Sequence, residues 1–252
     1  MNAEVKQALS KVPEVTLIFW VIKIFATTLG ETGGDALSMS MGLGYLLSTA
    51  IFGAIFMVAV GFQMYSKKFH PVTYWATIIA TTTVGTTLAD YADRSLGIGY
   101  AGGSALLLGL LLTSLLVWKQ TLGSVAVDTV SSPKSEIFYW VTIMFSQTLG
   151  TALGDWVADT EGLGYLASAL IFGGLLAAIA VAYYRTKISR TVLFWAAFIL
   201  TRPLGAVVGD FLDKPYSSGG LELSRYSASA ALMLVIVLMI FAFNHRPATA
   251  NH

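Results

Sequence analysis

The stretch FWVIKIFATTLGETGGD, residues 19–35, decides the fold class because it places charges inside an otherwise apolar helix. Lys23, Glu31 and Asp35 stand in a segment that is long enough to reach most of the way across a bilayer. Insertion scales put the cost of one charge at mid-membrane at about 2.5–3.5 kcal/mol. These three groups are therefore expected to face one another or water, and not lipid.

The composition agrees with a membrane protein. The chain has 252 residues, of which 56% are hydrophobic and only 12% are charged, whereas soluble domains carry about 25% charged residues. Several apolar runs reach the roughly 20 residues that a membrane-spanning helix needs. The net charge of +1 says nothing about nucleic acid, and since no basic run suggests it, nucleic acid is not expected as a partner.

Two further features narrow the class of protein. The sequence has no cysteine, which excludes disulfides, thiolate metal ligands and cysteine nucleophiles. The first fifteen residues are polar and do not follow the pattern of a cleaved signal peptide, so the first apolar segment is expected to remain as a helix.

A fourfold internal repeat organises the chain. An aromatic residue followed by Trp occurs four times, a glycine follows each Trp after ten residues, and an aspartate follows each glycine after five. The four sets are Trp20, Gly30 and Asp35; Trp75, Gly85 and Asp90; Trp140, Gly150 and Asp155; and Trp195, Gly205 and Asp210. Residues 19–53 and 139–173 are identical at 17 of 35 positions without a gap.

Each repeat is predicted to be a helical hairpin. In three repeats the aspartate is followed by Gly-Leu-Gly-Tyr or Gly-Ile-Gly-Tyr, which is typical of a turn, and then by a second apolar run. We expect an all-α integral membrane protein with eight transmembrane helices in a single membrane domain, residues 1–252. The repeats are expected at about 15–65, 72–119, 137–185 and 191–244, with helices at 15–36, 43–65, 72–92, 98–118, 137–158, 163–184, 191–211 and 224–243.

Basic residues predict the orientation. Most lysines and arginines, from Lys6 to Arg246, precede or separate the hairpins, and the loops within hairpins hold only Arg94, Lys214 and Arg225 beside several acids. The positive-inside bias then puts both termini in the cytoplasm. All four hairpins point the same way, so they are expected to be parallel repeats with pseudo-symmetry about an axis along the membrane normal.

The first helix of each repeat is predicted to carry a polar stripe, because residues four apart share a helix face. The expected ligands of a cation are Glu31, Asp35, Asp90, Asp155 and Asp210, and the expected neutral ligands are Thr27, Thr82, Thr86, Gln147 and Thr151. Lys23 and Arg202 are expected to balance their charge. On this count five acids face two bases, an excess of three negative charges that protons, cations or solvent must offset.

Pairs of small residues lie beside these stripes. They are predicted to let the four polar helices pack closely, so that the stripes meet in a shared interior. The pairs are Gly30 and Gly34, Gly85 and Ala89, Gly150 and Gly154, and Gly205 and Gly209. The aromatic-Trp dipeptides are expected to be anchors at the cytoplasmic interface, and the plainer second helices are expected to face lipid.

The pattern of Trp, nine residues, Gly, four residues and Asp resembles a group of bacterial multi-pass membrane proteins built from repeats of domain of unknown function 347. The likeness covers all four repeats, about residues 15–243, and implies a bacterial inner-membrane protein. Glu31-Thr-Gly-Gly-Asp35 is also similar to the Glu-x-Gly-Asp signature of small cation/proton exchangers that export manganese or calcium. The spacing differs by one residue, the following base is absent, and only the first repeat carries the glutamate.

These features favour a small secondary transporter, a proton-coupled exporter of a hard divalent cation with manganese as the first candidate. Oxygen ligands without cysteine or membrane histidine suit manganese, magnesium or calcium better than copper or zinc. No resident cofactor is expected; the lipid bilayer and the cation are the expected partners, and association of two copies stays open. Catalytic motifs are lacking, so an enzyme is not expected.

Three alternatives remain at this level. Glu31 and Arg202 can form a purely structural ion pair, and the aspartates can simply end their helices. The protein can be a channel, or a carrier of another small solute that uses Lys23 and Arg202. It can also be a non-transporting membrane scaffold in which buried charges only fix the helix register.

Overall fold

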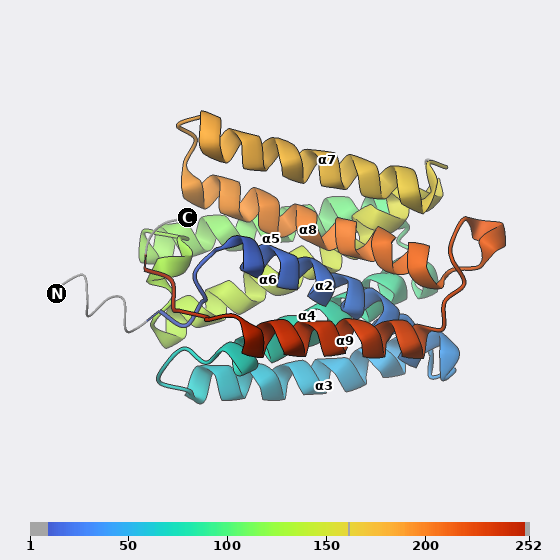
Figure 1. Cartoon of the computed structure of the whole chain (residues 1–252), viewed down its shortest axis with the longest axis horizontal. Coiled ribbons are helices and arrows are strands. Elements are labelled where there is room, and N and C mark those ends of the chain that lie inside the picture. The colour runs from blue at the N-terminus through green and yellow to red at the C-terminus, as the bar shows by residue number, and fades with distance from the viewer. Residues whose placement is uncertain (1–9, 161, 250–252) are drawn as a thin grey trace.

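The computed structural model describes residues 10–160 and 162–249, and these residues are mostly helical (Figure 1). Lys6, which enters the orientation prediction, lies outside the described residues. Eight long helices in the described part agree with the ranges expected from the sequence. They are α2 (Leu17–Asp35), α3 (Gly44–Tyr65), α4 (Pro71–Asp90), α5 (Tyr100–Leu122), α6 (Pro133–Asp155), α7 (Gly164–Arg185), α8 (Arg190–Asp213) and α9 (Arg225–Ala242).

Four of these helices form the interior of the molecule. They are α2, α4, α6 and α8, the helices that bear the Trp-Gly-Asp motif, and each packs against two others of the group in the closed order α2, α4, α6, α8. The four glycine-containing motifs therefore surround a common centre. We call these four the inner helices.

The other four helices cover the inner ones in a regular way. Each outer helix packs on the inner helix of the following repeat: α3 on α4, α5 on α6 and α7 on α8. The last outer helix, α9, packs on α2 and so joins the fourth repeat to the first. Each repeat therefore needs a neighbouring repeat to bury its apolar surface, as is usual for repeat architectures.

The small-residue pairs set the spacing of the inner helices, as predicted. A Cβ atom at Gly30 would overlap Thr82, and one at Gly34 would crowd Thr86, both on α4. The same relation recurs around the group, since each glycine meets the polar stripe of the next inner helix. The further pairs are Gly85 with Gln147, Gly150 with Arg202, Gly205 with Thr27 and Gly209 with Glu31.

The turns within the hairpins follow the glycine pattern. Both glycines of the first three turns have positive φ, between +66° and +78°, which only glycine adopts without strain. Before each of these turns a single stretch of π-helix extends the inner helix beyond its aspartate, at Ala36–Ser40, Tyr91–Ser95 and Trp156–Thr160. The helix α2 runs unbroken through Gly33 and Gly34.

The aromatic-Trp pairs do not anchor the protein in the membrane interface, and that prediction is wrong. Trp75, Trp140 and Trp195 are at most 5% exposed, and only Trp20 remains partly accessible. The rings pack against one another across the inner helices, for example Tyr74 against Trp140 at 5.8 Å between centroids. At this end of the inner helices the rings form one cluster with neighbouring apolar residues. We call this end the aromatic end.

The first and last described segments of the chain, around Pro13 and Pro247, close over the aromatic end (Figure 1). Ala248 donates its backbone N–H to Val12, and an isolated β-bridge joins Pro13 to Pro247. Beneath this cap, Lys11 forms a buried ion pair with Glu136, with 2.7 Å between Nζ and Oε1. The terminal segments therefore belong to the packed core of this end.

Five helices, α3, α5, α7, α8 and α9, are long and apolar enough to cross a membrane. The other three long helices, α2, α4 and α6, are inner helices whose polar stripes lower their apolar content. Their polar side chains are buried against neighbouring helices, so these helices need not be apolar on every face. The protein is thus a helical membrane protein with a polar interior.

Candidate functional site: a buried charge network

The four repeat aspartates lie together at the end opposite the aromatic end, which we call the acidic end. Asp35, Asp90 and Asp155 are the last residues of α2, α4 and α6, and Asp210 lies one turn before the end of α8. Each aspartate is at most 2% exposed. The sequence therefore correctly predicts that the four carboxylates converge in the interior.

Two bases from the hairpin turns bridge these aspartates in pairs. Arg94 contacts Asp90 at 2.9 Å and Asp155 at 3.0 Å. Lys214 contacts Asp35 at 2.6 Å and Asp210 at 3.1 Å. Each base thus joins the carboxylates of two neighbouring inner helices and holds the acidic end closed.

A third base completes this network. Arg225, at the start of α9, lies 2.9 Å from Asp213 and 3.6 Å from Asp35. The ion pairs form two groups, Arg94 with two aspartates and Lys214 and Arg225 with three, and each group carries a formal charge of minus one, which gives the network minus two. The expected excess of three negative charges over Lys23 and Arg202 is wrong, because bases from the turns enter the cluster.

Lys214 stays charged in this setting. Burial lowers its pKa, but the carboxylates of Asp210 and Asp35 raise it more, so that the pKa ends above the ordinary lysine value. The contribution of the Lys214 charge to stability is therefore present below the pKa of a free lysine and is lost as the pH rises through the higher value.

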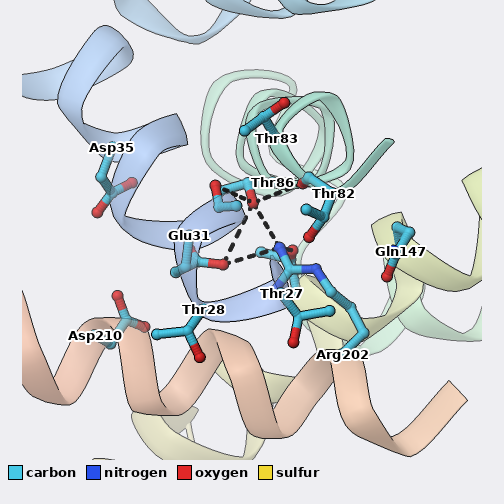
Figure 2. A network of polar contacts seen from close by, with 12 residues as sticks. Thr27, Thr28, Glu31, Asp35, Thr82, Thr83, Thr86, Gln147, Arg202 and Asp210 are labelled. Atoms are coloured by element: carbon cyan, nitrogen blue, oxygen red, sulfur yellow. Dashed lines mark hydrogen bonds and ion pairs between the residues drawn. The ribbon is translucent and has the colours of Figure 1, made fainter. Parts of the chain in front are cut away.

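Glu31 and Arg202 form the centre of the polar interior, with Glu31 on the side of Asp35 and Asp210 (Figure 2). The distance from Arg202 Nη2 to Glu31 Oε2 is 2.9 Å, and Arg202 is fully buried. The same nitrogen contacts the hydroxyls of Thr86 and Thr151. The pairing of Glu31 with Arg202 that the sequence left open is therefore present.

Glu31 also lies close to the aspartates. Oxygen atoms of Glu31, Asp35 and Asp90 lie within 4.8 Å of one another, and those of Glu31, Asp155 and Asp210 do the same. A third such group consists of Asp35, Asp210 and Asp213. These distances allow a cation to contact carboxylates from different inner helices after modest movement.

Several carboxylate oxygens of this group lack a hydrogen-bond partner among the described residues. They include Oδ1 of Asp35, Oδ2 of Asp90 and Oδ1 of Asp155, all of them buried. Buried carboxylate oxygens normally have a hydrogen-bond partner. Because these atoms have none among the described residues, they can accept a proton or contact a cation.

The predicted neutral ligands fall into two groups. Thr86 and Thr151 contact Arg202 directly, whereas the Thr27 hydroxyl donates to the backbone of α2 and to Thr201 at 3.1 Å. Thr82 and Gln147 lie farther from the aspartates, on the other side of Arg202 (Figure 2). Of these hydroxyls, that of Thr86 contacts the Glu31 carboxylate at 3.4 Å, and that of Thr151 shares Arg202 Nη2 with it.

Lys23 lies apart from the acids. Its Nζ atom is 3.5 Å from Gln147 Oε1, 3.4 Å from Thr201 Oγ1 and 4.2 Å from the centre of the Phe198 ring. In the part of the chain that the structure describes, Lys23 forms no ion pair. It does not balance the carboxylates directly, contrary to the prediction.

The sequence analysis missed Arg94, Lys214, Arg225 and Asp213 as members of the site. A signal for two of them was present, since Arg94 and Lys214 each stand four residues after a repeat aspartate. One more helical turn puts such residues on the same face as the aspartate. The helix ends expected from the sequence lie before that turn, which places both bases in loops.

The fold and this buried network define a class: repeat-built helical membrane proteins with a charged interior. The family described as Repeat of Unknown Function (DUF347) matches four times, at residues 18–69, 73–123, 138–189 and 193–248. The chain belongs to this family. No curated protein and no solved structure matches it significantly.

Proposed function

We propose that this protein is a secondary transporter that exchanges a hard divalent cation, with manganese as the first candidate, for protons. The observation behind this proposal is the ion-pair network of the acidic end. Five buried aspartates and three bases leave a formal charge of minus two. One divalent cation or two protons would neutralise it, which is the relation that an exchanger requires.

The ligand chemistry supports a hard cation. Besides Arg202, the polar groups around Glu31 are carboxylate and hydroxyl oxygens, and the sequence has no cysteine. Oxygen-rich sites suit manganese, magnesium and calcium, whereas copper and zinc favour nitrogen and sulfur. In this proposal Glu31 and the four repeat aspartates bind the cation, and Thr86 and Thr151 are neutral ligands.

The two closed ends support a carrier over an open channel. Packed aromatic rings block one end of the inner helices, and the Arg94 and Lys214 bridges hold the other. A carrier opens its two ends alternately, and ion pairs that a cation can displace are suitable contacts for the outer gate. Binding of the cation would release Arg94 or Lys214 from the aspartates.

The proposed setting is a bacterial inner membrane that all eight long helices cross. The basic residues before and between the hairpins favour a cytoplasmic aromatic end with both termini inside. The repeated packing of outer on inner helices supports pseudo-symmetry about the membrane normal. The acidic end then faces the outside.

Transport by purified protein in liposomes tests this function. A pH gradient is expected to drive manganese across the membrane, detected by a metal-sensitive dye, with two protons moving the opposite way. Asp90→Asn is expected to lower the rate at least about tenfold, because it removes a buried ligand. Asp159→Asn, an exposed change near the same end, is the matched control.

A folded wild-type protein that moves none of manganese, magnesium or calcium would exclude the proposal. Equal rates for Asp90→Asn and Asp159→Asn would exclude the acidic end as the binding site.

A further inference from the structure

A group of buried nitrogen donors between Lys23 and Arg202 is not used by the cation site. Arg202 Nε and Nη1 and Gln147 Nε2 have no hydrogen-bond partner among the described residues. Lys23, Gln147 and Arg202 are each 0% exposed. Figure 2 shows Gln147 on the Nε side of Arg202, opposite to Glu31.

These donors come from three inner helices that meet at one level. Arg202 of α8 lies against Gly150 of α6, where a Cβ atom would overlap it. Gln147 stands one turn before Gly150, and its amide oxygen contacts Lys23 of α2 at 3.5 Å. The three side chains therefore border the same region between α2, α6 and α8.

The charge of this region is positive. Lys23 and Arg202 are opposed by one carboxylate, Glu31, which pairs with Arg202. The contacts of Lys23 are two long ones to neutral oxygens and one to a phenyl ring. A buried ammonium without a counter-charge is costly, and so is each buried N–H that lacks a partner.

We infer that a small monovalent anion of the chloride class binds between Lys23, Gln147 and Arg202. An anion accepts hydrogen bonds from all three donors and neutralises the charge of Lys23. A cation cannot do this, because the unpartnered atoms are all donors. The site is distinct from the proposed cation site and does not depend on its function.

A groove in the aromatic half of the molecule lies close to the anion site. The groove, of about 400 Å³ between α2, α7 and α8, is lined by Trp20, Arg190 and Thr201, among others. The Thr201 hydroxyl at this groove lies 3.4 Å from Lys23 Nζ. The donors are thus one side chain away from a groove that also contains a basic residue.

Thermal unfolding of the purified full chain tests this inference. The protein is kept in detergent with a chelator of divalent cations, and chloride or bromide replaces gluconate at constant ionic strength. The Tm is expected to rise by several degrees and to saturate, since a ligand stabilises the state that binds it. The chelator makes the result independent of cation transport.

Two variants assign the effect to the site. Lys23→Met is expected to abolish the saturable rise, whereas Lys119→Met, an exposed change on α5, is expected to keep it. Gln147→Glu adds a fixed carboxylate beside Lys23, so it is expected to raise the Tm in gluconate and to remove the halide response. Gln147→Glu also tests whether the halide binds at this site if Lys23→Met does not fold.

Bromide bound in crystals gives a direct readout, as anomalous density next to Lys23 and Gln147. A wild-type Tm that does not depend on halide overturns the inference. A halide response that persists unchanged in Gln147→Glu overturns it as well.

Discussion

The aromatic end and the acidic end of the inner helices are closed by different forces. At the aromatic end, rings such as those of Trp75 and Tyr139 are almost completely buried and touch other rings. At the acidic end, Arg94 and Lys214 hold the helices together through carboxylates. Apolar packing contributes to stability in proportion to buried area, whereas the net gain from a buried ion pair is small.

Because of this difference, one end of the inner helices is expected to provide stability and the other end to provide function. An aromatic contact is not replaced by a solute, but the contact of an ammonium group with a carboxylate can be exchanged for that of a metal ion or a proton. The aromatic end is thus expected to keep the bundle assembled while the acidic end changes partners. The following predictions test that division, beginning with the largest effect.

Trp75→Ala is expected to destabilise the protein by about 3–5 kcal/mol, because it removes a fully buried ring and leaves a cavity. Trp20→Ala, at the equivalent position of the first repeat, is the matched control and should cost less, since Trp20 is partly exposed. Unfolding of the detergent-solubilised protein measures both changes. If Trp75→Ala and Trp20→Ala lower the free energy of unfolding equally, the buried aromatic cluster does not dominate the stability of this end.

Glu31→Gln is expected to lower the free energy of unfolding by about 3 kcal/mol. This is the low end of the range for breaking a buried ion pair, because the amide oxygen still accepts a hydrogen bond from Arg202. It is also expected to stop cation transport. The double variant Glu31→Gln with Arg202→Met should regain stability but not transport, since no unpaired charge remains buried. A double variant that transports at the wild-type rate would remove Glu31 from the site.

Arg94→Gln is expected to raise the affinity for the divalent cation about tenfold, or about 1.4 kcal/mol, by removing a competitor for Asp90 and Asp155. Arg94→Gln should change the free energy of unfolding by less than it changes the free energy of cation binding, because the Arg94 side chain is 31% exposed. Cation titration followed by thermal unfolding measures the affinity. An unchanged or weaker affinity would show that Arg94 does not compete with the cation.

Tyr74→Phe is expected to give the smallest effect, about 1 kcal/mol, because it leaves the buried Tyr139 hydroxyl without its partner. The two hydroxyl oxygens are 2.6 Å apart. Cation transport should be unchanged, since this pair lies at the aromatic end. A loss of transport with normal stability would contradict the division between the two ends.

Periodic features of the structure were predictable from the sequence. The recurring Trp, Gly and Asp fixed the hairpins, the buried aspartates and the close approach of Gly30 to the neighbouring helix. These features depend on spacing along one helix and on repetition, both of which a single sequence displays.

Features that depend on contacts between distant segments were not predictable in the same way. The sequence shows that Tyr74 and Trp75 are amphipathic aromatic residues, but not that they face inward instead of toward the interface. Arg225 reaches Asp35 across 190 positions of the chain, with no periodic signal. Such partners follow only from the closed packing order of the helices.

That packing order has a consequence for the origin of the chain. A chain of only two repeats would expose one uncovered inner helix and one outer helix without a neighbour, and each would complement the other on a second copy. Two such copies could close head to tail, as α9 closes on α2 here. The 17 identities between residues 19–53 and 139–173 agree with a fusion of two such halves, of which only the first carries Glu31 and only the second carries Arg202.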